Sequence, residues 1–184
     1  TLPMSREKGE QGRETQLELH TYKHARTKPH HVAYKMVPSG EIVTYQQLED
    51  RSNQCAKLLR DEGLSRGSVI AILMENHARY LEVALAADRS GLYYTSISTQ
   101  LTASEAAYIV GDAGATVLFV SKAKLALGQA IAELVPGLTV FLVDGKSEGA
   151  RDYLEEREAC PRERIVDESQ GAPMLYSSGT TGRP

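Results

Sequence analysis

Nine consecutive residues, YSSGTTGRP at 176–184, combine residue types that bind phosphate groups. Gly179 and Gly182 permit backbone angles closed to other residues, and they leave room for a ligand beside the backbone. Four serine and threonine hydroxyls and the backbone amides supply hydrogen-bond donors. Such a concave set of donors is what a polyanion such as a triphosphate requires. Composition alone fits a flexible Ser/Thr/Gly linker equally well, so both interpretations stay open at this point.

Two other nucleotide-binding signatures are absent from the sequence. The run 176–184 cannot be aligned with Gly-x-x-x-x-Gly-Lys-Ser/Thr, so it is not a Walker A loop. The first buried strand that we expect, at 68–74, is not followed by Gly-x-Gly-x-x-Gly, so the dinucleotide-binding fingerprint is also missing.

The remaining polar candidates fit structural roles better than chemical ones. His20 and His24 would share one face of a helix, but no glutamate follows as in His-Glu-x-x-His, and we predict no metal site. We expect His77 to cap a helix and Asp144 to lie in a turn after a strand. No residue of the chain is assigned a catalytic role.

Strands and helices must alternate to position these residues. Short apolar runs, each separated by a helix-length segment, are typical of a parallel sheet with helices on its faces. We predict such strands at 68–74, 92–97, 115–121 and 138–144. The expected fold class is therefore α/β, with a largely parallel, doubly wound sheet flanked by helices and a β-hairpin before it.

The helices carry recognisable start signals. Capping boxes join Thr44 to Gln47 and Thr102 to Glu105, and Gly63 stands where a left-handed C-cap is needed. One face of the first helix should contain Leu48, Ser52, Cys55, Leu58 and Leu59. In the helix over 75–91, one stripe should contain Leu81, Ala84, Leu85 and Asp88. The mixed-charge run RDYLEEREACPRER is typical of a helix with a solvated face.

Composition excludes several functional classes. The 184 residues carry a net charge of −3 and a pI near 6.0, so no basic surface attracts nucleic acid or an anionic membrane. Cys55 and Cys160 match neither a disulfide framework nor a zinc pattern. No apolar run approaches the ~20 residues of a membrane span, and the charged first residues do not form a secretory signal. We expect a cytoplasmic protein without nucleic-acid or integral membrane contacts.

The character of the sequence changes near residue 30. Residues 1–28 are polar, and we predict a mobile arm there with a helix near Thr15–His24. Residues 29–184 form the predicted α/β unit, which ends inside the run described first.

The order of residues in that run resembles the phosphate-loop signature of the adenylate-forming (ANL) superfamily. There a hydrophobic segment precedes Ser/Thr-Ser-Gly-Thr-Thr-Gly-x-Pro-Lys, and Met174 to Pro184 match every position up to the proline. The stretches SGLYYTSIS and LTASEAAYIV look like the early part of an acyl-CoA synthetase. The similarity covers about residues 30–184.

The resemblance implies the N-terminal part of the large AMP-binding domain of a fatty-acid-CoA ligase. Such enzymes use ATP and Mg²⁺ to convert a carboxylic acid to an acyl-adenylate, releasing pyrophosphate, and then transfer the acyl group to coenzyme A. The loop that would hold the ATP phosphates comprises Ser177, Ser178, Gly179, Thr180, Thr181 and Gly182. Thr180 and Thr181 are the side chains that we expect to contact phosphate oxygens.

The superfamily's later motifs, which supply the adenine, magnesium and ribose contacts and a catalytic lysine, are absent from these residues. We therefore expect the 184-residue polypeptide alone to be inactive, and an exposed edge of a truncated sheet to cause self-association. The first alternative is an aryl-CoA ligase or a peptide-synthetase adenylation domain of the same superfamily. The second is a non-enzymatic α/β assembly module.

Overall fold

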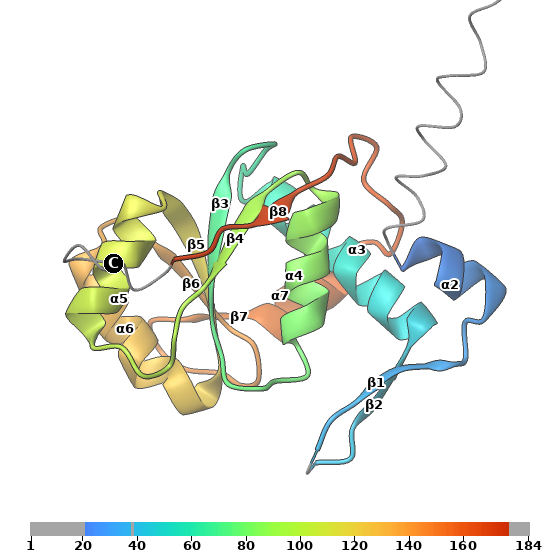
Figure 1. Cartoon of the computed structure of the whole chain (residues 1–184), viewed down its shortest axis with the longest axis horizontal. Coiled ribbons are helices and arrows are strands. Elements are labelled where there is room, and N and C mark those ends of the chain that lie inside the picture. Colours follow the sequence, from blue (N-terminus) through green and yellow to red (C-terminus); the bar gives the residue numbers. More distant parts are fainter. Residues whose placement is uncertain (1–20, 38, 177–184) are drawn as a thin grey trace, which may run out of the picture.

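The computed structural model describes residues 21–37 and 39–176, and a parallel β-sheet lies at its centre (Figure 1). Its strands lie in the order β7-β6-β5-β3-β4-β8, and all neighbouring pairs are parallel. Their bounds are β3 Val69–Leu73, β4 Tyr93–Ser96, β5 Ala115–Val120, β6 Thr139–Leu142, β7 Arg151–Asp152 and β8 Ala172–Pro173. The predicted parallel α/β sheet is confirmed. Each predicted strand differs from the observed one by only one or two residues at its ends.

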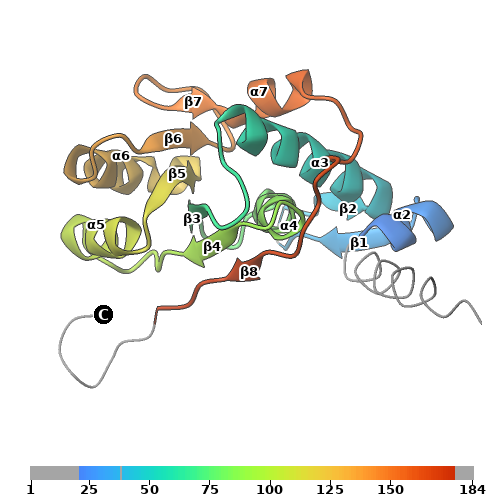
Figure 2. The ribbon, with the colours of Figure 1, turned by 90° about the horizontal axis from the view of Figure 1, so that it is seen from above.

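Helices cover both faces of this sheet (Figure 2). One face carries α3 (Tyr45–Asp61), α4 (Tyr80–Arg89) and α7 (Tyr153–Ala159). The opposite face carries α5 (Ala103–Asp112) and α6 (Leu125–Leu134), which follows a 3₁₀ turn at Lys122–Lys124. All residues of β3 are buried because both of its faces are covered.

Alternation along the strands divides the apolar core into two layers. Ile70 and Ile72 of β3 face the layer under α3, α4 and α7, whereas Ala71 and Leu73 face the layer under α5 and α6. A sheet with apolar side chains on both faces cannot be stable without both helix layers, so the two-sided cover follows from the strand sequences.

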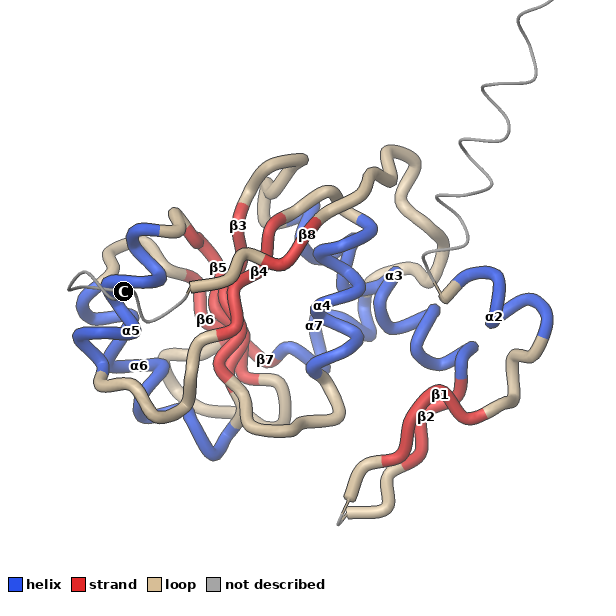
Figure 3. The backbone as a smooth tube through the Cα atoms, in the orientation of Figure 1, coloured by secondary structure: helices blue, strands red, loops and turns tan. Residues whose placement is uncertain are grey.

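A β-hairpin and a short helix lie beyond α3 (Figure 3). The antiparallel strands are β1 (Val32–Lys35) and β2 (Ile42–Thr44), and the hydroxyl of Tyr34 donates to the carbonyl of Ala78 at 2.6 Å. The short helix is α2 (Tyr22–Thr27), which packs on α3 and buries Ala25.

Residues 21–28, which we expected to belong to a mobile arm, contain α2 and contact α3. The hydroxyl of Thr21 donates to the buried Glu49 of α3 at 2.5 Å. Of the helix expected near Thr15–His24, residues 15–20 lie outside the described residues, and Tyr22–His24 belong to α2.

Both predicted capping boxes are confirmed. The hydroxyl of Thr44 accepts from the backbone N–H of Gln47, and the Gln47 side chain accepts from the backbone N–H of Thr44 at 2.9 Å. Thr102 and Glu105 make the same reciprocal pair at the start of α5. Gly63 has a φ of +80° after α3, which is the left-handed conformation that the sequence predicts there.

The predicted stripe of the fourth helix is wrong. Leu81 is 43% exposed, and the buried face of α4 instead contains Glu82, Val83, Ala84, Ala86, Ala87 and Arg89. A search for apolar residues at helical spacing misses this face, because two of its buried residues, Glu82 and Arg89, are charged. The helix also begins only at Tyr80, five residues after the predicted start.

The charged run has the predicted solvated face, with Glu155 and Glu158 exposed, but α7 also has a buried side. Tyr153 and Arg157 are buried there, and both bind the same carboxylate oxygen of Glu82, at 2.8 Å and 2.5 Å. Arg157 can be buried because its charge is paired with that of Glu82.

Within the described residues, we find no helix with the length and apolar character needed to cross a bilayer.

Candidate functional site

The predicted phosphate loop, Ser177–Gly182, lies outside the described residues. The structure does describe the segment that leads into it. Strand β8 lies at the edge of the sheet and pairs in parallel with the first half of β4. This strand comprises only Ala172–Pro173.

The backbone before β8 passes very close to the end of α4. Gly171 donates its N–H to the carbonyl of Asp88 at 2.6 Å. A Cβ at position 171 would lie 2.3 Å from the Leu92 carbonyl oxygen and 2.7 Å from that of Ala87. Only glycine allows this approach, so Gly171 fixes the position of β8 beside β4.

Two hydrogen bonds hold the chain between β8 and the predicted loop. The backbone N–H of Met174 donates to the carbonyl of Tyr94 at 2.8 Å. The hydroxyl of Tyr176 donates to Oδ2 of Asp112, the last residue of α5, at 2.7 Å. Burial and the Asp112 carboxylate together raise the pKa of Tyr176 to about 12. The described chain is thus held up to the residue that precedes Ser177.

Polar side chains also gather where the central strands end. Glu75 follows β3 and Ser121 follows β5, and the Ser121 hydroxyl donates to Oε2 of Glu75 at 2.6 Å. Burial would raise the pKa of Glu75, but hydrogen bonds, led by the one from Ser121, lower it overall. The carboxyl ends of neighbouring parallel strands are a common ligand-binding position in α/β folds.

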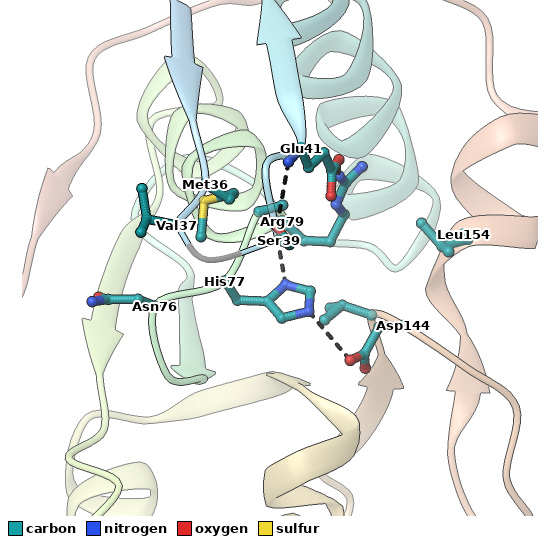
Figure 4. Close-up of a pocket in the computed structure, with 11 residues that line it drawn as sticks. Met36, Val37, Ser39, Glu41, Asn76, His77, Arg79, Asp144 and Leu154 are labelled. Carbon is teal, nitrogen blue, oxygen red and sulfur yellow. Dashed lines mark hydrogen bonds and ion pairs between the residues drawn. The ribbon is translucent and has the colours of Figure 1, made fainter.

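His77 and Asp144 meet at the same edge (Figure 4). Nε2 of His77 lies 3.2 Å from Oδ2 of Asp144, and Nδ1 accepts the backbone N–H of Arg79 at 3.1 Å. The other oxygen of Asp144 accepts the backbone N–H of Lys122 at 2.6 Å. Both ring nitrogens are thus engaged within the fold, and the arrangement ties three loops together.

These contacts test the two predictions that His77 caps a helix and that Asp144 lies in a turn. The cap predicted for His77 is wrong, because α4 begins after Arg79 and has no side-chain cap there. Asp144 does lie in the turn after β6, where its carboxylate also holds the loop after β5.

Two open cavities lie between the hairpin and these strand ends. One, of about 460 Å³, contains His77, Asp144 and Arg79 in its lining together with Met36 and Leu154. Tyr34 and Tyr80 line the other, of about 810 Å³, and their hydroxyls bind Ala78 and Ser96. Their sizes suit small molecules.

The described part of the chain offers no metal centre. Between residues 21 and 176, with residue 38 excluded, no three His, Cys, Asp or Glu side chains converge as metal ligands. His24 packs its ring on Tyr45, with a centroid distance of 4.9 Å, and His20 is outside the described residues. Cys55 is buried and Cys160 is partly buried, and both are free thiols.

Sequence reasoning missed three features of this region. Gly171 and the pairs Asp112–Tyr176 and Glu75–Ser121 were not singled out. Asp112 and Tyr176 are 64 residues apart, so no local spacing in the sequence indicates that they form a pair. Glu75 and Ser121 could have been found, because each is a polar residue directly after a buried strand run.

Comparison with known proteins gives a family match over most of the chain. A family model described as "AMP-binding enzyme" matches residues 21–184. Surfactin synthase subunit 2 of Bacillus subtilis (strain 168) is 30% identical over 163 residues, which cover 88% of this chain and 4% of that protein. The fatty acid–[acyl-carrier-protein] ligase ScoC of Streptomyces coeruleorubidus is 28% identical over 145 residues, covering 79% of this chain and 27% of ScoC.

A solved structure shares the fold. The anthranilate CoA ligase AuaEII, in complex with anthranoyl-AMP, superposes with a TM-score of 0.75 and 25% identity over 87% of this chain and 32% of that one. The chain spans less than a third of the length of these relatives.

Proposed function

The chain belongs to the AMP-binding enzyme family of the adenylate-forming superfamily, and on that premise we propose that it contributes the phosphate loop of an ATP-dependent acyl-CoA synthetase. The observation that carries the proposal is the run Ser-Ser-Gly-Thr-Thr-Gly, which residues 174–176 join to β8, within a family match over residues 21–184. The relatives include a fatty acid ligase and an anthranilate CoA ligase, so the family match alone does not determine the acid substrate.

The reaction has two balanced steps. A carboxylate oxygen of the acid attacks the α-phosphorus of ATP, the bond to pyrophosphate breaks, and an acyl-adenylate forms. The thiolate of coenzyme A then attacks the acyl carbon, and AMP leaves with the bonding electron pair. Both steps need the phosphate charge to be held in a fixed place by preorganised donors.

In this proposal the loop residues bind and orient the triphosphate. The backbone N–H groups around Gly179 and Gly182 and the hydroxyls of Thr180 and Thr181 are donors of the right chemistry for phosphate oxygens. The described part of the chain adds the support of the loop through Gly171, Met174 and Tyr176. No described residue is assigned to Mg²⁺ or coenzyme A, because no carboxylate cluster suited to the metal exists among them.

For the acid, we propose a fatty acid. The stretches SGLYYTSIS and LTASEAAYIV resemble acyl-CoA synthetases, and ScoC is by its name a fatty acid ligase. An aryl acid is the second candidate, because the anthranilate CoA ligase superposes well on this chain. An amino acid, as in a peptide-synthetase adenylation domain, is the third.

The test uses the natural protein that carries this sequence. Exchange of labelled pyrophosphate into ATP is measured with fatty, aromatic and amino acids, and coenzyme A is then added to detect a thioester. We expect exchange with fatty acids followed by acyl-CoA formation. Exchange with aromatic acids alone would replace the fatty-acid proposal by the aryl one.

Loop variants give the matched control. Thr180→Ala and Thr181→Ala should each lower the exchange rate at least about tenfold, as expected when a hydrogen bond to a charged phosphate is lost. Thr27→Ala, at the exposed last residue of α2, should leave it unchanged. The non-enzymatic assembly module would be favoured if the natural protein is folded, shows no pyrophosphate exchange with any of the acids, and binds no ATP.

A further inference from the structure

We propose that Asp112 is a positioning residue for the phosphate loop and acts through its hydrogen bond to Tyr176. The proposal rests on the proposed function, because only then does the run 177–182 hold the phosphates of ATP. Asp112 itself would touch neither nucleotide nor acid. Its part would be to fix the direction in which the chain enters the loop.

The contacts define two fixed points just before the loop. The backbone N–H of Met174 is bound to the carbonyl of Tyr94, and the hydroxyl of Tyr176 is bound to Asp112. The side chains of Met174 and Tyr176 pack against the same apolar layer as α5 and β5. Leu175, between them, is 84% exposed and contributes little. The phenol of Tyr176 is therefore the last side-chain anchor that the described chain provides.

The place of Asp112 on its helix also needs an explanation. It is the last residue of α5, where the carbonyl ends of the helix carry partial negative charge. A carboxylate is unfavourable there, and the last turn of α5 contains no basic residue to offset it. A hydroxyl donor from outside the helix, 64 residues later in the chain, is the partner that this carboxylate has.

The functional consequence concerns the affinity for the nucleotide. A chain that is already held at Tyr176 has less conformational freedom to lose when the residues that follow bind a triphosphate. Breaking the anchor should therefore weaken ATP binding. It should leave the affinity for the acid unchanged, because none of these residues is assigned to the acid.

The test compares three variants in the natural protein that carries this sequence. Tyr176→Phe removes the donor but keeps the ring, Asp112→Ala removes the acceptor, and Asp112→Asn keeps a neutral acceptor oxygen. ATP affinity is measured by titration calorimetry without any acid, and the KM values for ATP and the acid are measured separately. Tyr108→Phe, on the same helix with a 43% exposed side chain, is the matched control.

We expect Tyr176→Phe and Asp112→Ala to weaken ATP binding about tenfold, because the variants must order this part of the chain on binding, at a cost of about 1.4 kcal/mol. Asp112→Asn should recover most of the affinity, and the double variant should be no weaker than either single one. The KM for the acid and the control should not change.

Two outcomes separate failure of this inference from failure of the proposed function. If the wild type binds ATP and both anchor variants bind it within about twofold of wild type, the positioning role is refuted. If the wild type itself does not bind ATP, the proposed function fails first. Should Asp112→Ala lower the melting temperature, Tyr176→Phe carries the test, because its ring still packs against α5.

Discussion

Replacing Glu49 by glutamine should remove a large part of the stability of the fold. Arg89 is fully buried, and its NH1 and NH2 donate to the two carboxylate oxygens of Glu49 at 3.0 Å and 2.7 Å. Glu49 is 4% exposed and also accepts from Thr21 and Asn53. One carboxylate therefore joins α3 to α4 and to the residue that precedes α2.

The magnitude follows from the charge that would remain unpaired. In Glu49→Gln, Arg89 stays buried, and the next carboxylate oxygen, of Glu168, is 3.7 Å from its NH1. Removing one partner of a buried pair costs about 3–5 kcal/mol. For a chain of this size, such a loss should lower the melting temperature by about 6–20 °C.

The assay is urea denaturation followed by far-ultraviolet circular dichroism, because the chain contains no tryptophan. Asp50→Asn is the matched control: Asp50 is the next residue and its ion pair with the exposed Arg162 is 3.7 Å long. Surface pairs contribute at most about 1 kcal/mol, so the control should unfold near the wild type. If Glu49→Gln has the same urea midpoint as the control, the importance of the buried pair is refuted.

The same pair predicts how stability changes with pH. Burial would raise the pKa of Glu49, but the hydrogen bonds and charge of Arg89 lower it overall below its ordinary value of 4.5. A depressed folded-state pKa stabilises the protein above the unfolded-state pKa, and this contribution is lost as the pH falls through the folded-state pKa. Wild type should therefore lose stability below about pH 4.5 more steeply than Glu49→Gln.

Three further predictions concern other parts of the chain. Burial raises the pKa of the Cys55 thiol, so an alkylating reagent should label Cys160 slowly and Cys55 only after unfolding; rapid native labelling of Cys55 would contradict this. Gly171→Ala should cost at least about 2 kcal/mol in urea denaturation, because its Cβ would collide with two carbonyl oxygens; an unchanged midpoint would refute it. Self-association, expected from the sequence, should use the exposed surface beside β8, so Leu175→Lys should lower the mass that light scattering reports at high concentration; a monomeric wild type would count against it.

The elements that were predicted correctly have their signal in short segments. The strand Val69–Leu73 is a continuous apolar run, and the capping boxes at Thr44 and Thr102 are complete within four residues. Such local patterns determine the sheet class and the helix starts, because they do not depend on distant parts of the chain.

The errors occurred where distant residues decide burial. Glu82 and Arg89 look like solvent residues of α4, but they are buried because Arg157 and Glu49 neutralise them from other helices. Tyr153 and Arg157 were not distinguished from the solvated face of α7 for the same reason. A one-dimensional pattern shows the charge of a residue but not the partner that allows it to be buried.

For the candidate site, the order of residues in the run 177–182 was informative about the family, whereas the spacing of polar residues elsewhere in the sequence was not. The run 177–182 identified the family through its order alone, and the family model matches the chain through residue 184. The support of that run could not be predicted, because Asp112 and Gly171 act through contacts with residues on other strands and helices.

Hydrogen–deuterium exchange of the natural protein that carries this sequence, with and without ATP, tests the central claim most directly. The claim is that residues 177–182 hold the phosphates of ATP. We predict that ATP slows exchange of the backbone amides at 177–182, while the amides at 161–168 exchange as before. ATP that binds and slows exchange elsewhere, with 177–182 unchanged, would contradict the claim.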